Sequence, residues 1–324
     1  MENPLTVGKA FGKAAEIRSY KEDAQWVLPS CMVGVELELE GIAPTFKFSG
    51  SNYWEVKEDG SLRDINDGET SKELVFSVPL CGYDLTKALS ILKHTLDKQK
   101  KKPVTSPRCS THIHIDVREL TFNKLLNFLV LYTIVERPLY HYCGNSRENN
   151  NFCLPFYKAE GAIFSHISSK DMLSGANELV ASVLSNKRYS GLNICALKLF
   201  GSVEFRHLPG TVDVDKITQW INILMCIKKA AIEYNGQLQL IPKTFSEKGI
   251  ENNVKEIFKN YYQYITYPEL EYDVLQGIRQ AQDILYETTD NEQLYSKCFL
   301  EKSASCSTHV NNVVSKLKLN VKKK

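Results

Sequence analysis

The sequence lacks the features that mark several common protein classes. Its nine cysteines contain no Cys-x-x-Cys pair and their number is odd, which argues against a zinc ribbon. Residues 1–17 contain no apolar stretch of signal-peptide length, and the longest apolar run, near residues 128–135, is too short to cross a bilayer. We therefore expect a cytoplasmic protein with free thiols and no membrane partner.

A bias in charge is absent as well. The 40 lysines and arginines nearly balance the 38 aspartates and glutamates, so the net charge of +2 gives no reason to expect a nucleic-acid partner. The sequence also has no glycine-rich phosphate loop. This absence argues against nucleotide binding by a P-loop.

The length and composition are those of an ordinary globular protein. With 324 residues, 43% hydrophobic and 24% charged, the chain can bury a substantial core. We find no internal repeat and no long linker, and predict one catalytic domain over residues 1–300, with a motif core at 31–234 and a helical part at 235–300. Residues 301–324 hold six lysines against one glutamate and are expected to form a mobile, solvated tail.

Hydrophobic periodicity predicts clusters of strands separated by helices. Alternating residues indicate strands at 31–41, 54–56, 74–78, 110–117, 192–197 and 203–207. Amphipathic or apolar stretches indicate helices at 85–98, 121–142, 170–186, from Asp213 or Asp215 to about 234, and 252–290. This order predicts an α+β fold with helices packed on one face of a mainly antiparallel sheet.

The most informative segment is Gly34-Val35-Glu36-Leu37-Glu38-Leu39-Glu40. The period of a strand places the three glutamates on one face and the apolar residues on the other, with side chains of one face about 6–7 Å apart. Such a face is either solvated or a binding surface for hard divalent cations, which favour carboxylate oxygens. Because glutamate is depleted in strands, we favour a metal site at Glu36 and Glu38. Glu40 is expected to be exposed.

Two further carboxylates are candidates for the same site. Glu73 heads an apolar strand and could be either an exposed strand end or another ligand. Asp59 lies in the turn sequence Asp59-Gly60-Ser61, where it could shape the turn or orient an amine beside a metal cluster.

The segment Ser110-Thr111-His112-Ile113-His114-Ile115-Asp116 places two histidines on one strand face. Histidines two residues apart can meet one cation, or one ligand and one phosphate. They could equally be a half-buried, hydrogen-bonded pair. If both His112 and His114 bound one metal, zinc or iron would be natural.

Arginines supply candidate phosphate- or carboxylate-binding groups. Glu204 and Arg206 share a face of the strand Val203-Glu204-Phe205-Arg206-His207, as a surface ion pair or as a metal ligand beside an anion-binding residue. Arg137, Arg147 and Arg188 lie near the end of the long apolar helix, in the polar loop after it and before the Gly191-Leu192-Asn193 segment.

Taken in order, these motifs resemble the amidoligase family, which belongs with glutamine synthetase and glutamate–cysteine ligase. The resemblance covers roughly Cys31 to Tyr234 and rests on Gly34-x-Glu36-x-Glu38, Glu73 with Pro79, Thr111-His112-x-His114, Arg137 with Tyr142-Cys143, Arg188-Tyr189-x-x-Leu192-Asn193, Glu204-Phe205-Arg206, and Gly210-Thr211-x-Asp213 before a helix with Trp220. Residues 235–324 match nothing, and no separate N-terminal domain like that of glutamine synthetase is evident.

The resemblance implies a glutamine-synthetase-like catalytic fold, a curved antiparallel sheet with helices on its outer face. It implies metal ligands at Glu36, Glu38, Glu73 and Glu204, joined by His112, with His114 as the other candidate. Arg206 would bind phosphate or carboxylate, and Arg137, Arg147 and Arg188 compete for the remaining phosphate-binding role.

The activity implied is ATP-dependent ligation of a carboxylate to an amine through an acyl phosphate. Two or three Mg²⁺ ions would bridge the phosphates, and Mn²⁺ could replace them. Asp59 or Glu73 would accept the proton of the amine. The substrates would be small-molecule or peptide carboxylates and amines, and a homo-oligomer stays open. The alternatives are a metal-dependent hydrolase or oxygenase using His112 and His114, and an inactive relative that only binds a partner.

Overall fold

The computed structural model describes residues 6–13, 20–43, 46, 52–64, 70–144, 146–155 and 189–288. The predicted helix at 170–186, Arg188 and the tail at 301–324 lie outside these residues. Within the described part of the chain, no helix combines the length and the apolar character needed to span a bilayer. The seven cysteines described there form no disulfide bond with one another.

A six-stranded antiparallel sheet forms the centre of the molecule, in the order β2-β3-β1-β4-β6-β5. Its strands are β1 (Val33–Ile42), β2 (Trp54–Lys57), β3 (Thr70–Phe76), β4 (Ser110–Asp116), β5 (Leu192–Asn193) and β6 (Ser202–Pro209). The predicted α+β class with an antiparallel sheet is therefore confirmed.

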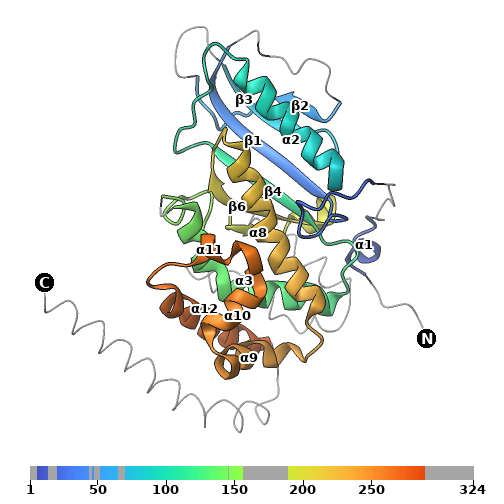
Figure 1. Ribbon diagram of the computed structural model, residues 1–324, viewed down its shortest axis with the longest axis vertical. Coiled ribbons are helices and arrows are strands. Elements are labelled where there is room, and N and C mark those ends of the chain that lie inside the picture. The colour runs from blue at the N-terminus through green and yellow to red at the C-terminus, as the bar shows by residue number, and fades with distance from the viewer. Residues whose placement is uncertain are drawn as a thin grey trace, which may run out of the picture.

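The described helices include three that lie beside the sheet and a group of four at the end of the described chain (Figure 1). Their bounds are α1 (Val7–Ala10), α2 (Gly82–Asp97), α3 (Phe122–Cys143), α7 (Ala196–Phe200), α8 (Val214–Glu233), α9 (Ile241–Lys248), α10 (Ile250–Phe258), α11 (Tyr262–Ile265) and α12 (Leu270–Thr288). Local capping fixes where α3 and α8 begin. Thr121 caps α3, and the Asp213 carboxylate accepts the amides of Asp215 and Lys216 at the start of α8.

Helices α2, α3 and α8 cover one face of the sheet. Phe205 of β6 makes edge contacts with Phe128 and Tyr132 of α3 and with Trp220 of α8. The indole of Trp54 in β2 donates to the Ala88 carbonyl of α2 at 2.9 Å. Because strand side chains alternate, burying this apolar face leaves Glu36 and Glu38 of β1, the two histidines of β4 and Glu204 of β6 on the opposite face.

Two predicted elements are wrong in type or extent. The strand expected at 192–197 ends at Asn193, whose side-chain oxygen accepts the Cys195 amide at 2.9 Å and turns the chain into α7. The helix expected at 252–290 is broken at Lys259, which has a φ of 47°, and again before α12. The helices α9 to α12 pack against α3 and α8 (Figure 1).

Candidate metal centre

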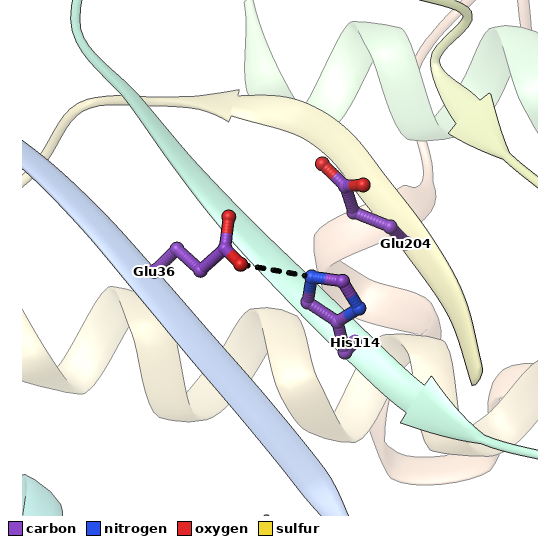
Figure 2. A group of neighbouring side chains, drawn as sticks. All are labelled: Glu36, His114 and Glu204. Atoms are coloured by element: carbon purple, nitrogen blue, oxygen red, sulfur yellow. Dashed lines mark ion pairs between the residues drawn. The ribbon is translucent and has the colours of Figure 1, made fainter. Parts of the chain in front are cut away.

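Antiparallel pairing brings the acidic and histidine motifs together on the face that α2, α3 and α8 do not cover. Three cross-strand pairs do this: Glu36 with His112, Glu38 with Glu73, and His114 with Glu204. Figure 2 shows Glu36, His114 and Glu204 rising from three neighbouring strands and pointing toward one another. Segments up to 168 residues apart in sequence, from Glu36 to Glu204, thus meet because of register alone.

Three overlapping groups of side chains could each hold a cation. They are Glu36 with His114 and Glu204, Glu36 with Glu73 and His112, and Glu38 with Asp59 and Glu73. Within each group the candidate ligand atoms lie within 4.8 Å of one another. The groups share Glu36 and Glu73, so they form one continuous row across the sheet.

Glycine at position 34 makes room for this row. Gly34 pairs with His114 across the strands, and a Cβ atom on Gly34 would lie 3.1 Å from the His114 Cβ atom. A larger residue would therefore crowd the base of the histidine. This gives a physical reason for the glycine that precedes Glu36 in the acidic motif.

The two histidines lie on either side of the Glu36 carboxylate. His112 Nδ1 is 3.1 Å from Glu36 Oε2 and 3.5 Å from Glu204 Oε1. His114 Nε2 is 3.3 Å from Glu36 Oε1, but the two groups are not aligned for a hydrogen bond, so they form an ion pair only. His114 Nδ1 lies 3.1 Å from the hydroxyl of Ser202.

The metal-free side chains have strongly perturbed acidities. Burial opposes ionisation of Glu36, but the ring nitrogens of His112 and His114 outweigh it and hold the pKa of this carboxyl well below its usual range. Burial would lower the pKa of His114, but Glu36 and Glu204 reverse the sign and raise it. Burial, with the charges of Glu36, Asp59 and Glu38, raises the pKa of Glu73 to about 7.

Glu204 is held from two sides. Asn193 Nδ2 donates to Glu204 Oε2 at 2.6 Å, and the Arg206 guanidinium pairs with Glu204 Oε1. Arg206 also donates through Nε to the Phe152 carbonyl at 3.0 Å and lies over the Tyr189 ring, 6.0 Å from its centroid. Arg206 is thus held in place beside the row of candidate ligands, at the end where His114 and Glu204 lie.

The other predicted arginines lie elsewhere. Arg147 is buried and donates through Nη2 to the Arg206 carbonyl at 2.9 Å, and its charge acts on His207, on the helix-covered face. Arg137 lines a separate recess of about 310 Å³ with Tyr140, His141, Glu148, Tyr267, Glu269 and Asp273. Neither placement tests a phosphate-binding role.

Sequence reasoning missed three residues and misplaced one. Ser110, Asn193 and Ser202 contact candidate ligands. Asn193 belongs to one of the quoted motifs but was given no role, and the only sequence signal of the two serines is their position at strand ends near the motifs. The expectation that Glu40 is exposed is wrong. Its side chain is 2% exposed and accepts the Arg63 amide at 3.2 Å.

The donor atoms present fit divalent cations. Carboxylate oxygens dominate, as Mg²⁺ and Mn²⁺ prefer, and two imidazole nitrogens join them. His114 Nε2 is buried with no hydrogen-bond partner among the described residues, although it faces a carboxylate. A cation between them would satisfy both groups, because buried charges and lone pairs of this kind are otherwise costly.

A comparison with known families and proteins gives the following. Curated protein sequences give no match to the chain. The family model described as "Putative amidoligase enzyme" matches residues 49–227, more than half of the chain. That segment includes Glu73, His112, His114, Glu204 and Arg206 and begins after β1, so Glu36 and Glu38 join them through the sheet register. The chain therefore belongs to the amidoligase family.

Proposed function

We propose that this protein is an ATP- and Mg²⁺-dependent ligase that joins a carboxylate to an amine through an acyl-phosphate intermediate. The observation that carries the proposal is the row of carboxylates and histidines on four adjacent strands, within a chain of the amidoligase family. The row is long enough to offer three overlapping cation sites. Several neighbouring cations suit the binding of a triphosphate better than they suit a hydrolase that uses a single metal ion.

A carboxylate is a poor electrophile, so the ligase would first transfer the γ-phosphoryl group of ATP to a carboxylate oxygen. The amine nitrogen would then attack the acyl carbon, and the C–O bond to phosphate would break. Divalent cations supply charge neutralisation at the phosphate oxygens when bound. Glu36, Glu38, Glu73, Glu204 and the two histidines would hold them.

The two ends of the row suit different substrates. At one end, Glu38, Asp59 and Glu73 concentrate negative charge, which favours an amine or ammonium group. Glu73, with its pKa raised to about 7, is suited to accept the proton that the attacking amine loses. Asp59 is the second candidate for this role.

At the other end, Arg206 provides a fixed cation beside Glu204. A guanidinium held by a carboxylate, a backbone carbonyl and an aromatic ring needs no rearrangement to meet an anion. We propose that it stabilises the phosphate or the substrate carboxylate. Arg137, Arg147 and Arg188 remain candidates for a second phosphate contact.

ADP release tests the proposal. The full chain with ATP and Mg²⁺ would be screened with amino acids and peptides as carboxylates, and with amines as acceptors. We expect substrate-dependent ADP release that Glu38→Gln removes, whereas Glu55→Gln, an exposed glutamate on β2, leaves it unchanged. Equal release by wild type and Glu38→Gln would contradict the proposed site.

A metal-dependent hydrolase or oxygenase is the second candidate. It is favoured by the group formed by Glu36, His114 and Glu204, because a nitrogen ligand between carboxylates also suits a transition metal. This alternative requires one tightly bound transition metal in the purified protein and turnover without ATP. The ligase requires weakly held Mg²⁺ and formation of ADP.

A further inference from the structure

Ser110, the first residue of β4, links two of the candidate ligands. Its backbone amide and its hydroxyl each lie 2.7 Å from Glu38 Oε2. The same hydroxyl lies 2.7 Å from His112 Nε2. Ser110 is buried, so these contacts are not exchanged with solvent.

The single hydroxyl hydrogen of Ser110 decides how these groups are bonded. An ionised Glu38 carboxylate can only accept, so the Ser110 hydroxyl donates to it. The hydroxyl oxygen then accepts a hydrogen bond, and its partner is His112. His112 must therefore carry its hydrogen on Nε2 and donate it to Ser110.

In a neutral ring, which is the form that binds a metal, this arrangement leaves the Nδ1 lone pair of His112 facing Glu36 and Glu204. Their nearest oxygens lie 3.1 and 3.5 Å from Nδ1. A lone pair facing two carboxylates is unfavourable unless a cation lies between them. A neutral imidazole nitrogen is itself a common ligand for divalent metals.

We propose that Ser110 is a positioning residue that holds His112 as the Nε2–H tautomer and so makes Nδ1 the metal-binding atom. The role depends on the metal centre of the proposed function. His114 provides a contrast, because Ser202 contacts its Nδ1 atom and Nε2 faces Glu36 instead. The two histidines thus present different nitrogens to the two oxygens of one carboxylate.

The test is ¹⁵N NMR of imidazole-labelled protein without metal and with Zn²⁺ as a diamagnetic probe, together with Zn²⁺ titration calorimetry. In the Zn²⁺-bound wild type we expect His112 to carry hydrogen on Nε2 and to bind through Nδ1. Ser110→Ala should lose this tautomer and bind Zn²⁺ about 10–100-fold more weakly. Ser110→Thr keeps a hydroxyl and should restore both.

Ser202→Ala is the matched control, because it removes the equivalent hydroxyl from His114 and should change the His114 signals without moving those of His112. A wild-type spectrum with hydrogen on His112 Nδ1, or Ser110→Ala with unchanged tautomer and affinity, would overturn the role of Ser110. If Ser110→Ala does not fold, the wild-type and Ser110→Thr spectra test whether Ser110 sets the tautomer of His112. Absence of ADP release with the expected tautomer would instead refute only the ligase activity.

Discussion

His112 and His207 lie on opposite faces of the sheet and are both almost completely buried. Each ring uses Nε2 in the same way. His112 contacts the Ser110 hydroxyl at 2.7 Å, and His207 contacts the Tyr132 hydroxyl at 3.0 Å. In both cases the hydroxyl donates to a buried glutamate, so both rings are expected to carry their hydrogen on Nε2.

The other ring nitrogen separates the two histidines. His112 Nδ1 faces Glu36 and Glu204, whereas His207 Nδ1 has no hydrogen-bond partner among the described residues. Burial and the charge of Arg147 lower the pKa of His207 to about 3. One histidine therefore faces a site that attracts cations, and the other is held neutral in the core.

The comparison shows that burial alone does not identify a functional histidine. The helix-covered face surrounds His207 with aromatic rings, including Tyr140 and Trp220, which make charge costly. The uncovered face surrounds its histidines with carboxylates, which makes the absence of a cation costly. The sign of the local charge distinguishes a structural from a ligand role.

The largest expected effect is loss of activity on the uncovered face. Glu36→Gln removes the carboxylate shared by two of the three cation groups, so substrate-dependent ADP release should fall on the order of 1000-fold. ADP release in the presence of Mg²⁺ is the measurement, with Glu55→Gln as the control. Activity within a few-fold of wild type would show that Glu36 is not a ligand.

The second prediction concerns pH and the covered face. The folded-state pKa of His207 is about 3 against an ordinary value of 6.5, so the unfolded state binds more protons between these values. Stability should therefore fall as pH decreases from 6.5 toward 3, by about 4 kcal/mol from this group. His207→Gln keeps a polar atom near Nε2 without a titrating ring, so its unfolding free energy should depend less on pH.

Urea unfolding of both proteins at pH 7 and pH 4 measures this difference. The same loss of stability in the two proteins would show that His207 titrates normally. Zn²⁺ affinity at pH 7 should not differ between them, because His207 does not face the metal centre.

The sequence predicted much of the site because strand period is a local property. It placed Glu36 and Glu38 on one face correctly, and the order of motifs indicated Glu73, His112 and Glu204. It failed at Glu40 because the burial of this side chain involves a residue distant in sequence, Arg63, whose amide it accepts, and no single-strand pattern can reveal such a contact.

Other failures share a cause that is not local. Ser110 and Asn193 are short polar residues whose importance comes from cross-strand register, which is set by the whole sheet. The end of the strand after Leu192 depends on one side-chain hydrogen bond from Cys195 to Asn193. Placing Arg137 required the packing of α12 on α3, which periodicity does not give.

The third prediction tests the buried hydrogen-bond network formed by Tyr132, Glu136 and His207. Tyr132→Phe removes a hydroxyl that donates to Glu136 at 2.7 Å and contacts His207, in a fully buried position. The unfolding free energy should fall by about 2 kcal/mol, because buried polar groups lose a hydrogen-bond partner. Zn²⁺ titration calorimetry should give unchanged affinity. A weaker affinity with unchanged stability would mean that the covered face controls the metal centre.

The smallest expected effect concerns Glu73, whose influence on stability changes with pH in the direction opposite to that of His207. The pKa of Glu73 is raised to about 7 from 4.5, so the folded, metal-free protein binds more protons than the unfolded chain in this window. Its contribution to stability is lost as pH rises through the window, and above pH 7 the ionised carboxylate is a net cost. Because Glu73 is only half-buried, that cost is about 1 kcal/mol after screening.

Glu73→Gln should therefore be more stable than wild type without metal at pH 8, and the difference should disappear at pH 4. Mg²⁺ should raise the melting temperature of the wild type more than that of the variant, which keeps only the cation group without Glu73. A variant that is less stable at pH 8 would show that Glu73 is already compensated by protein groups. The uncovered face would then be a satisfied polar surface like the network around His207, and the contrast between the two faces would fail.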